Sequence, residues 1–247
     1  MDLGLKGRTA LVTGASSGLG LATAEALAAE GANVTMFARR RDLLQREADR
    51  LGALAVRGDV RNPRDLETAV RRTVEAFDGL DILVWNGGGP PPGTALQVTP
   101  EALEEAIDLL LMPAVRLVEL CVPHIVKSPA GRILFFTSNA VREPADNLAL
   151  TNAVRPGLTG WAKSLSRELG PEGVTVNCVS PGRIETARLV QLYPGGPSEA
   201  DLNGIPLRRW GTPKEFGDVA CFLASDRARY ITGTTVLVDG GLSRGLL

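Results

Sequence analysis

The chain alternates short apolar runs with longer segments in which apolar residues recur at helical spacing. The apolar runs are residues 9–13, 33–37, 53–56, 81–85, 132–137, 174–179 and 234–239. The helical segments are residues 19–29, 43–51, 66–77, 102–125 and 158–169. Strands that are apolar throughout, each followed by a helix, are typical of a parallel sheet buried on both faces. The pattern therefore predicts an α/β fold of the Rossmann type, a doubly wound parallel sheet with helices on both faces.

The domain organisation predicted from the sequence is a single domain over residues 1–247. A chain of 247 residues allows one or two domains, but no linker-like stretch divides it. Two clusters of proline and glycine, at residues 87–93 and 193–198, follow strand-like segments, where active-site loops usually lie. We expect the second cluster to belong to a substrate lid over about residues 187–212.

The composition argues against nucleic-acid and membrane partners. The formal net charge is -1, and no segment shows the basic face that a phosphate backbone requires. The apolar runs are far shorter than the roughly 20 residues of a bilayer-spanning helix, and the N-terminal residues lack the layout of a signal peptide, so we expect a cytoplasmic protein. Cys121, Cys178 and Cys221 are widely spaced in apolar surroundings, which predicts buried thiols and neither a disulfide nor a metal site.

A glycine-rich turn, TGASSGLG at residues 13–20, follows the first predicted strand and opens the first helix. Gly14 and Gly18 let the chain turn tightly and bring backbone N–H groups close to a pyrophosphate, while Gly20 lets the helix pack on the strand. The helix dipole favours an anion at the same place. The alternative is a tight strand-to-helix turn without a ligand, but the strand and helix context favours dinucleotide binding.

The end of the second predicted strand indicates which dinucleotide is bound. An NAD-binding protein usually carries a carboxylate there for the ribose 2′-hydroxyl, whereas this chain has Phe37, Ala38 and then three arginines, residues 39–41. Three cations at a helix start oppose the helix dipole, so a phosphate partner would offset a local cost. We therefore predict NADP(H), with Arg39 contacting the 2′-phosphate and NAD as the other possibility. The alternative interpretation is a solvated basic surface.

The motifs taken together resemble the short-chain dehydrogenase/reductase family over almost the whole chain. The matching segments are TGASSGLG, GDV at residues 58–60, WNGGG at residues 85–89, GRILFFTS ending at Ser138, VNCVSPGRIET at residues 176–186 and TGTTVLVDGG at residues 232–241. The resemblance implies a nicotinamide cofactor, hydride transfer to or from a carbonyl or alcohol carbon of a small molecule, and a homotetramer. The predicted cofactor-binding residues are Gly14, Ser16, Ser17, Gly18, Leu19, Gly20, Arg39, Asp59, Val60, Asn86, Gly88, Pro181, Gly182, Ile184 and Thr186.

The catalytic residues depart from the pattern of that family. Its chemistry uses an Asn, a Ser, and a Tyr and Lys four residues apart, of which only the serine is matched here, by Ser138. The family spacing places Thr151 and Arg155 at the Tyr and Lys positions and Leu110 at the Asn position. An aliphatic hydroxyl is a much weaker acid than a phenol, and an arginine keeps its proton, so Thr151 needs help to act as a proton donor.

Pro156 follows Arg155 within the predicted helix that begins near Leu148. Proline disfavours helical geometry in the residue before it, so we expect Arg155 at a helix start or a kink. Two roles for Arg155 are equally compatible with the sequence. It could bond the hydroxyls of the nicotinamide ribose, or it could pair with a nearby carboxylate.

Other groups could replace the missing tyrosine as the acid. Water is one candidate. A carboxyl of Glu143 or Asp146, in the loop after Ser138 that also holds Asn147, is a second candidate, and Tyr193 in the lid is a third. His124, the single histidine, is expected to have a surface or packing role because it lies at the far end of its helix.

Two hypotheses of function follow. The first is an NADP(H)-dependent oxidoreductase with a diverged site formed by Ser138, Thr151 and Arg155. The second is a non-catalytic dinucleotide sensor or partner subunit on the same fold. The intact phosphate turn, Asn86 and the segment at residues 181–186 favour a bound cofactor under both hypotheses.

Overall fold

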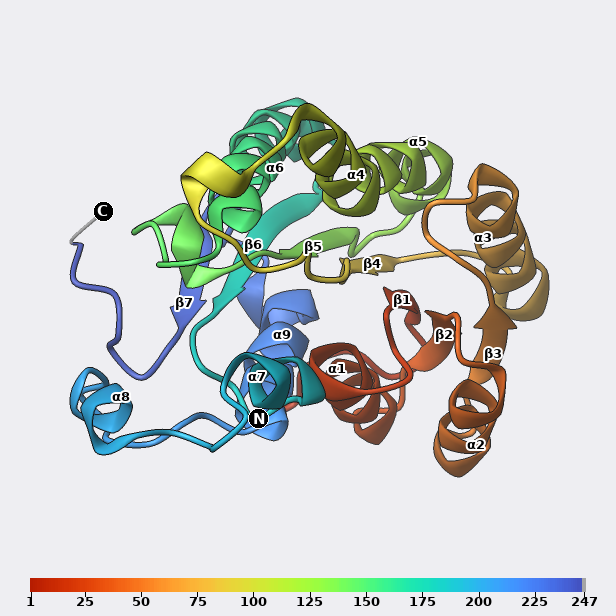
Figure 1. Cartoon of the computed structure of the whole chain (residues 1–247). Coiled ribbons are helices and arrows are strands. Elements are labelled where there is room, and N and C mark those ends of the chain that lie inside the picture. The colour runs from red at the N-terminus through yellow and green to blue at the C-terminus, as the bar shows by residue number, and fades with distance from the viewer. Residues whose placement is uncertain (246–247) are drawn as a thin grey trace.

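The computed structural model describes residues 1–245, and its centre is one parallel sheet of seven strands (Figure 1). The strands are β1 (Thr9–Thr13), β2 (Asn33–Ala38), β3 (Leu54–Arg57), β4 (Ile82–Trp85), β5 (Arg132–Phe136), β6 (Thr175–Pro181) and β7 (Thr235–Val238). Their order in the sheet is β3-β2-β1-β4-β5-β6-β7, and all pairs are parallel. The predicted Rossmann-type fold is confirmed. The direction of winding reverses between β1 and β4, where such sheets bind ligands at the carboxyl ends of the strands.

Two layers of helices cover the sheet, as Figure 1 shows. One layer holds α1 (Gly18–Ala29), α2 (Arg41–Leu51) and α9 (Pro213–Ala224), and the other holds α3 (Pro63–Phe77), α4 (Pro100–Leu110), α5 (Met112–Ile125) and α6 (Ala149–Leu169). Alternate residues of β1 separate the two cores: Val12 packs with Phe216 of α9, while Leu11 packs with Leu117 of α5 and Leu158 of α6. Within residues 1–245, no helix has the length and apolar character to cross a bilayer.

Capping side chains and prolines fix where three of the helices begin. The side chains of Asn62, Thr99 and Thr212 accept hydrogen bonds from backbone N–H groups in the first turns of α3, α4 and α9, at 3.1 to 3.2 Å. In each helix the next residue is a proline, whose fixed φ suits the first helical position and whose missing N–H has no partner to lose.

The helix predicted over residues 102–125 is in fact two helices. The first, α4, ends at Leu110, and α5 begins at Met112, with Leu111 at the junction. Pro113 lies in the first turn of α5 and cannot donate the hydrogen bond that a continuous helix would need. The break therefore follows from Pro113, which a prediction from apolar periodicity alone does not take into account.

The expectation that Arg155 lies at a helix start or kink is wrong. The helix α6 runs without interruption from Ala149 to Leu169, with Pro156 inside it, so Arg155 lies in its second turn. Leu150 and Val154, which precede the proline, are buried against Leu110 of α4, and this apolar packing stabilises the helical turns that Pro156 disfavours.

The segment expected to form a lid contains two short helices beside the carboxyl ends of the strands. These are α7 (Ala187–Leu192) and α8 (Glu199–Asn203). The segment has a small apolar core of its own, formed by Leu189, Ile205 and Trp210. It is thus a packed unit that lies over one end of the sheet (Figure 1).

We predict that the close packing of α1 on α9 makes Gly217→Ala destabilising. A Cβ atom at Gly217 would lie 2.6 Å from the carbonyl oxygen of Ala22, so the two helices would have to separate, at a cost of about 1–3 kcal/mol in the free energy of unfolding. Urea denaturation measures this change. The matched control is Gly160→Ala at an exposed position of α6, where nothing lies within 4 Å of the added Cβ atom and higher helix propensity should add about 0.5–1 kcal/mol to the free energy of unfolding. Equal stability of the two variants would contradict the prediction.

Candidate functional site

A large cavity opens at the carboxyl ends of the strands, where the sheet changes direction. Its volume is about 1260 Å³. Of the eighteen residues that the sequence predicts for the site, all except Gly20 line it. They are Gly14, Ser16, Ser17, Gly18, Leu19, Arg39, Asp59, Val60, Asn86, Gly88, Ser138, Thr151, Arg155, Pro181, Gly182, Ile184 and Thr186. The fold thus brings residues from across the whole sequence to one cavity.

The glycine-rich turn is shaped by contacts that exclude side chains. Gly14 has a φ of +60°, and a Cβ atom there would lie 2.7 Å from Nδ2 of Asn86. A Cβ atom at Gly20 would lie 2.8 Å from the same nitrogen, which explains why Gly20 supports the turn from behind without lining the cavity. Ser17, at the start of α1, forms no side-chain bond to the first N–H groups of the helix. This helix start is therefore suited to bind a phosphate.

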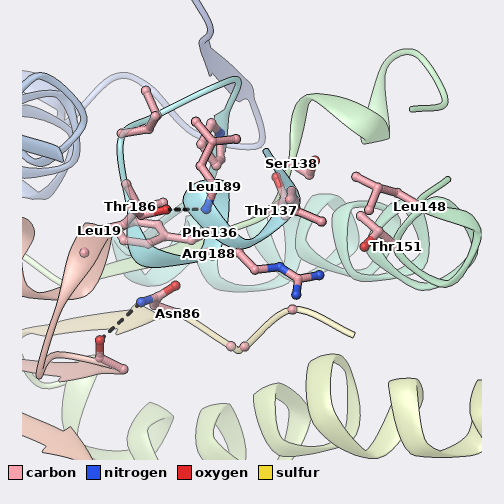
Figure 2. Close-up of a pocket in the computed structure, with 18 of the residues that line it drawn as sticks. Leu19, Asn86, Phe136, Thr137, Ser138, Leu148, Thr151, Thr186, Arg188 and Leu189 are labelled. Carbon is pink, nitrogen blue, oxygen red and sulfur yellow. Dashed lines mark hydrogen bonds between the residues drawn. The ribbon is translucent and has the colours of Figure 1, made fainter. Parts of the chain in front are cut away.

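Asn86 connects the ends of the two central strands. Its backbone N–H donates to Oγ1 of Thr13 at 2.8 Å, and its side-chain amide donates to the carbonyl oxygen of Gly14 at 3.5 Å (Figure 2). The amide therefore fixes the glycine-rich turn relative to the loop after β4, from which the cavity continues towards Ser138.

Two of the three arginines after β2, Arg39 and Arg40, line the cavity, and the second of them was missed by the sequence prediction. Arg40 donates from Nη2 to Oγ of Ser17 at 2.6 Å and to Oγ of Ser16 at 3.3 Å, so its guanidinium lies on the glycine-rich turn. Arg39, the predicted residue, is exposed and lies 4.0 Å from the carboxylate of Asp59. The signal was present in the run of three arginines, but the sequence could not tell which of them turns inward.

Asp59 is already engaged by a neighbouring cation. Arg61 bonds its carboxylate at 3.1 Å, and this contact, supported by the more distant charge of Arg39, holds the pKa of Asp59 below its usual value. The residue is therefore a fixed anion at the edge of the cavity.

Ser138 and Thr151 present hydroxyl groups to the other end of the cavity. Ser138 follows β5, and its Oγ accepts the N–H of Ala140 at 3.2 Å and donates to Oδ1 of Asn139 at 3.4 Å. Thr151 lies in the first turn of α6, with its side chain directed into the same space (Figure 2). Both hydroxyls can bond a ligand oxygen.

Arg155 is a structural clamp formed by a buried cation. Its Nη1 donates to the carbonyl oxygen of Phe136 at 2.8 Å and its Nη2 to that of Gly88 at 2.9 Å, so it ties the end of β5 to the loop after β4. Burial, and to a lesser extent the charge of Arg188, lower the pKa of Arg155 to about 10. Of the two alternatives left open by the sequence, pairing with a carboxylate is wrong, because no carboxylate lies within ion-pair distance of Arg155 among residues 1–245. The carbonyl oxygens of Phe136 and Gly88 accept the hydrogen bonds of Arg155 instead.

Leu110 has a packing role at the position that the family resemblance assigns to an asparagine. It is fully buried and packs with Leu150 and Val154 between α4 and α6. This position therefore provides no polar group to the cavity.

The other candidate acids differ in their placement. Glu143, Asp146 and Asn147 line the cavity. Tyr193 also lines it, but its ring packs on Trp210 at 5.8 Å and lies 5.1 Å from the guanidinium of Arg183. His124 lies in the last turn of α5, outside the cavity lining.

Arg188, which the sequence analysis did not single out, reaches into the cavity from the first turn of α7. Its Nη2 donates to the carbonyl oxygen of Pro90 at 2.6 Å. Figure 2 shows its side chain extending across the cavity towards Thr151. No motif marks this residue, because its direction depends on how the lid folds back over the loop after β4.

Comparisons with known proteins show which family the chain belongs to. The family model described as enoyl-(acyl carrier protein) reductase matches residues 14–243. The 3-oxoacyl-[acyl-carrier-protein] reductase FabG of Vibrio cholerae is 35% identical over 244 residues, covering 97% of this chain and 99% of that protein. Cyclohexanol dehydrogenase of a Rhodococcus species is 32% identical, covering 98% of each chain.

Solved structures of similar fold include complexes with nicotinamide cofactors. L-sorbose reductase from Gluconobacter frateurii, complexed with NADPH and L-sorbose, superposes with a TM-score of 0.93 at 32% identity, covering 100% of both chains. The 3-ketoacyl-(acyl-carrier-protein) reductase of Brucella melitensis, complexed with NADH, has a TM-score of 0.90 at 32% identity and covers 97% of this chain and 100% of that one. With its parallel sheet, glycine-rich turn and matched length, the chain belongs to the short-chain dehydrogenase/reductase family, whose members are NAD(P)-dependent oxidoreductases.

Proposed function

We propose that the protein is an NADP(H)-dependent oxidoreductase that acts on a carbonyl or alcohol group of a small molecule. The observation that carries this proposal is the convergence of four separate segments on one cavity: the glycine-rich turn, the arginines after β2, Asn86 and residues 181–186. Relatives with the same fold have been solved with NADPH or NADH bound.

The residues of the cavity fit this cofactor. The N–H groups at the start of α1 would hold the pyrophosphate, and Arg39 and Arg40 would hold the 2′-phosphate. The close approach of Gly14 to Asn86 leaves the turn free of side chains where a pyrophosphate must come near the backbone. When bound, the nicotinamide supplies or accepts a hydride.

Ser138 would orient and polarise the reacting group. Its hydroxyl donates weakly to Asn139, so it can turn to donate to a carbonyl oxygen instead. Thr151 would supply a second hydroxyl to the same oxygen. The proton of the product alcohol would come from water at these hydroxyls, because the packing of Tyr193 on Trp210 holds that phenol in the lid. Arg155 would keep the loop after β4 in place.

The second candidate is a non-catalytic dinucleotide-binding sensor or partner subunit. It is favoured by the use of Arg155 as a backbone clamp and of Leu110 as packing, which leaves Ser138 as the single family catalytic group. The two candidates differ in turnover and agree in cofactor binding.

Organisation is part of the same proposal. We propose one domain with a lid at residues 187–212, and a homotetrameric assembly as the family resemblance implies. The short apolar runs of the sequence support a cytoplasmic location. Light scattering of the purified protein measures the assembly.

We expect the protein to bind NADPH more tightly than NADH, measured by fluorescence titration. Arg39→Ala and Arg40→Ala should each weaken NADPH binding by about tenfold and leave NADH binding unchanged, because each removes a charged contact to the 2′-phosphate. Arg41→Ala is the matched control, since Arg41 begins α2 outside the cavity lining. Equal effects of all three substitutions would show that the arginines act only through surface charge.

Turnover is tested by following NADPH oxidation with a panel of carbonyl compounds. We expect Ser138→Ala to lower kcat/KM by roughly 100-fold without changing the Kd for NADPH, because it removes a donor that is needed only when charge develops on the substrate oxygen. If the natural protein binds NADPH and oxidises it with none of the compounds, the non-catalytic candidate is supported.

A further inference from the structure

Two guanidinium groups lie against one loop at the inner end of the cavity. Arg155, from α6, bonds the carbonyl oxygen of Gly88, and Arg188, from α7, bonds that of Pro90. A Cβ atom at Gly89, between these two residues, would lie 3.0 Å from Nε of Arg188. The loop after β4 therefore holds both cations at the same part of the cavity, and the glycine makes room for one of them.

The partners of these cations bear no net charge. In the described chain, neither guanidinium has a carboxylate within 4.0 Å, and the oxygens that bond them are backbone carbonyls. Arg155 is 8% exposed, and burial lowers the pKa of both arginines. Arg155 is withdrawn from water and Arg188 is half-buried, and two neighbouring like charges without a counter-charge favour the binding of an anion.

None of the three acidic residues that line the cavity pairs with these two arginines. The carboxylate of Asp59 bonds Arg61, and that of Glu143 accepts the backbone N–H of Arg244 at 3.2 Å. Asp146, the third, forms no ion pair with either guanidinium. The charge of Arg155 and Arg188 is thus left for a ligand.

The phosphates of the cofactor have binding groups of their own. These are the N–H groups at the start of α1 and the arginines after β2, which belong to elements other than α6 and α7. Arg188 instead extends towards Thr151, and both line the same space as Ser138 (Figure 2). An anion held by the arginines would consequently belong to the molecule whose carbonyl group meets Ser138.

We propose that Arg188 and Arg155 bind the carboxylate of the substrate, which is an oxo acid or the corresponding hydroxy acid. This inference rests on the proposed function. A guanidinium carries five N–H donors, and the one hydrogen bond of Arg188 to the loop uses only Nη2, so donors remain for a carboxylate. In the reduction, the carbonyl carbon gains a hydride from NADPH, its oxygen gains a proton from water, and the carboxylate is unchanged. Arg188 is thus a specificity-determining residue.

Calorimetric titration with oxalate and its neutral isostere oxamide tests the site. We expect the natural protein to bind oxalate and not oxamide, and Arg188→Gln to weaken oxalate binding by about tenfold or more. The matched control is Arg209→Gln, which removes an exposed lid arginine that pairs with Glu215 outside the cavity and should leave oxalate binding unchanged.

Several outcomes would overturn the carboxylate site. They are equal binding of oxalate and oxamide, unchanged oxalate binding by Arg188→Gln, and binding of inorganic phosphate in place of oxalate. A loss of NADPH affinity in Arg188→Gln, with oxalate binding intact, would assign Arg188 to the cofactor instead. Oxalate is titrated into the protein with and without NADPH, and NADPH is titrated on its own. Absent NADPH binding would contradict the proposed oxidoreductase, and absent oxalate binding would contradict the carboxylate site, so the two proposals fail separately.

Discussion

The close contact between Gly14 and Asn86 is the constraint on which the site depends. It joins the end of β1 to the end of β4, the two neighbouring strands between which the sheet reverses its winding. The backbone N–H of Asn86 bonds Thr13 and its amide bonds Gly14, so the turn for the pyrophosphate and the loop towards the substrate hold a fixed relation. A side chain at Gly14 would collide with Asn86 and change the position of the turn relative to the loop.

The strands could be predicted from the sequence because their burial requires a continuous run of apolar residues. A strand covered on both faces is apolar throughout, as Ile82–Trp85 is. The glycine-rich turn could also be predicted, because few other turns need glycines in this pattern. The course of the helices was harder to predict. The helix breaks at Leu111 and continues through Pro156, because the preferences of proline compete with the packing of α4 on α6. The amino-acid sequence alone does not show that packing.

The chemistry of the site was predictable only where it follows motifs. Ser138 was placed correctly in the cavity, whereas the acceptors of Arg155 were not foreseen, because every residue has a carbonyl oxygen and none is marked in the sequence. Arg40 and Arg188 were missed for a related reason. Their side chains are long, and their directions are set by Ser17 and by the loop that contains Pro90, which lie far away along the chain.

The clamp formed by Arg155 also has a consequence for how this protein can change over evolutionary time. The guanidinium satisfies two carbonyl oxygens on different segments, and the turn of α6 that carries it packs through Leu150 and Val154 on Leu110. A lysine at position 155 would offer a single point of attachment for two acceptors, and a polar residue at position 110 would enter a filled apolar contact. A substitution at position 155 or position 110 alone would therefore cost stability unless its neighbours changed with it, so substitutions at these positions are coupled.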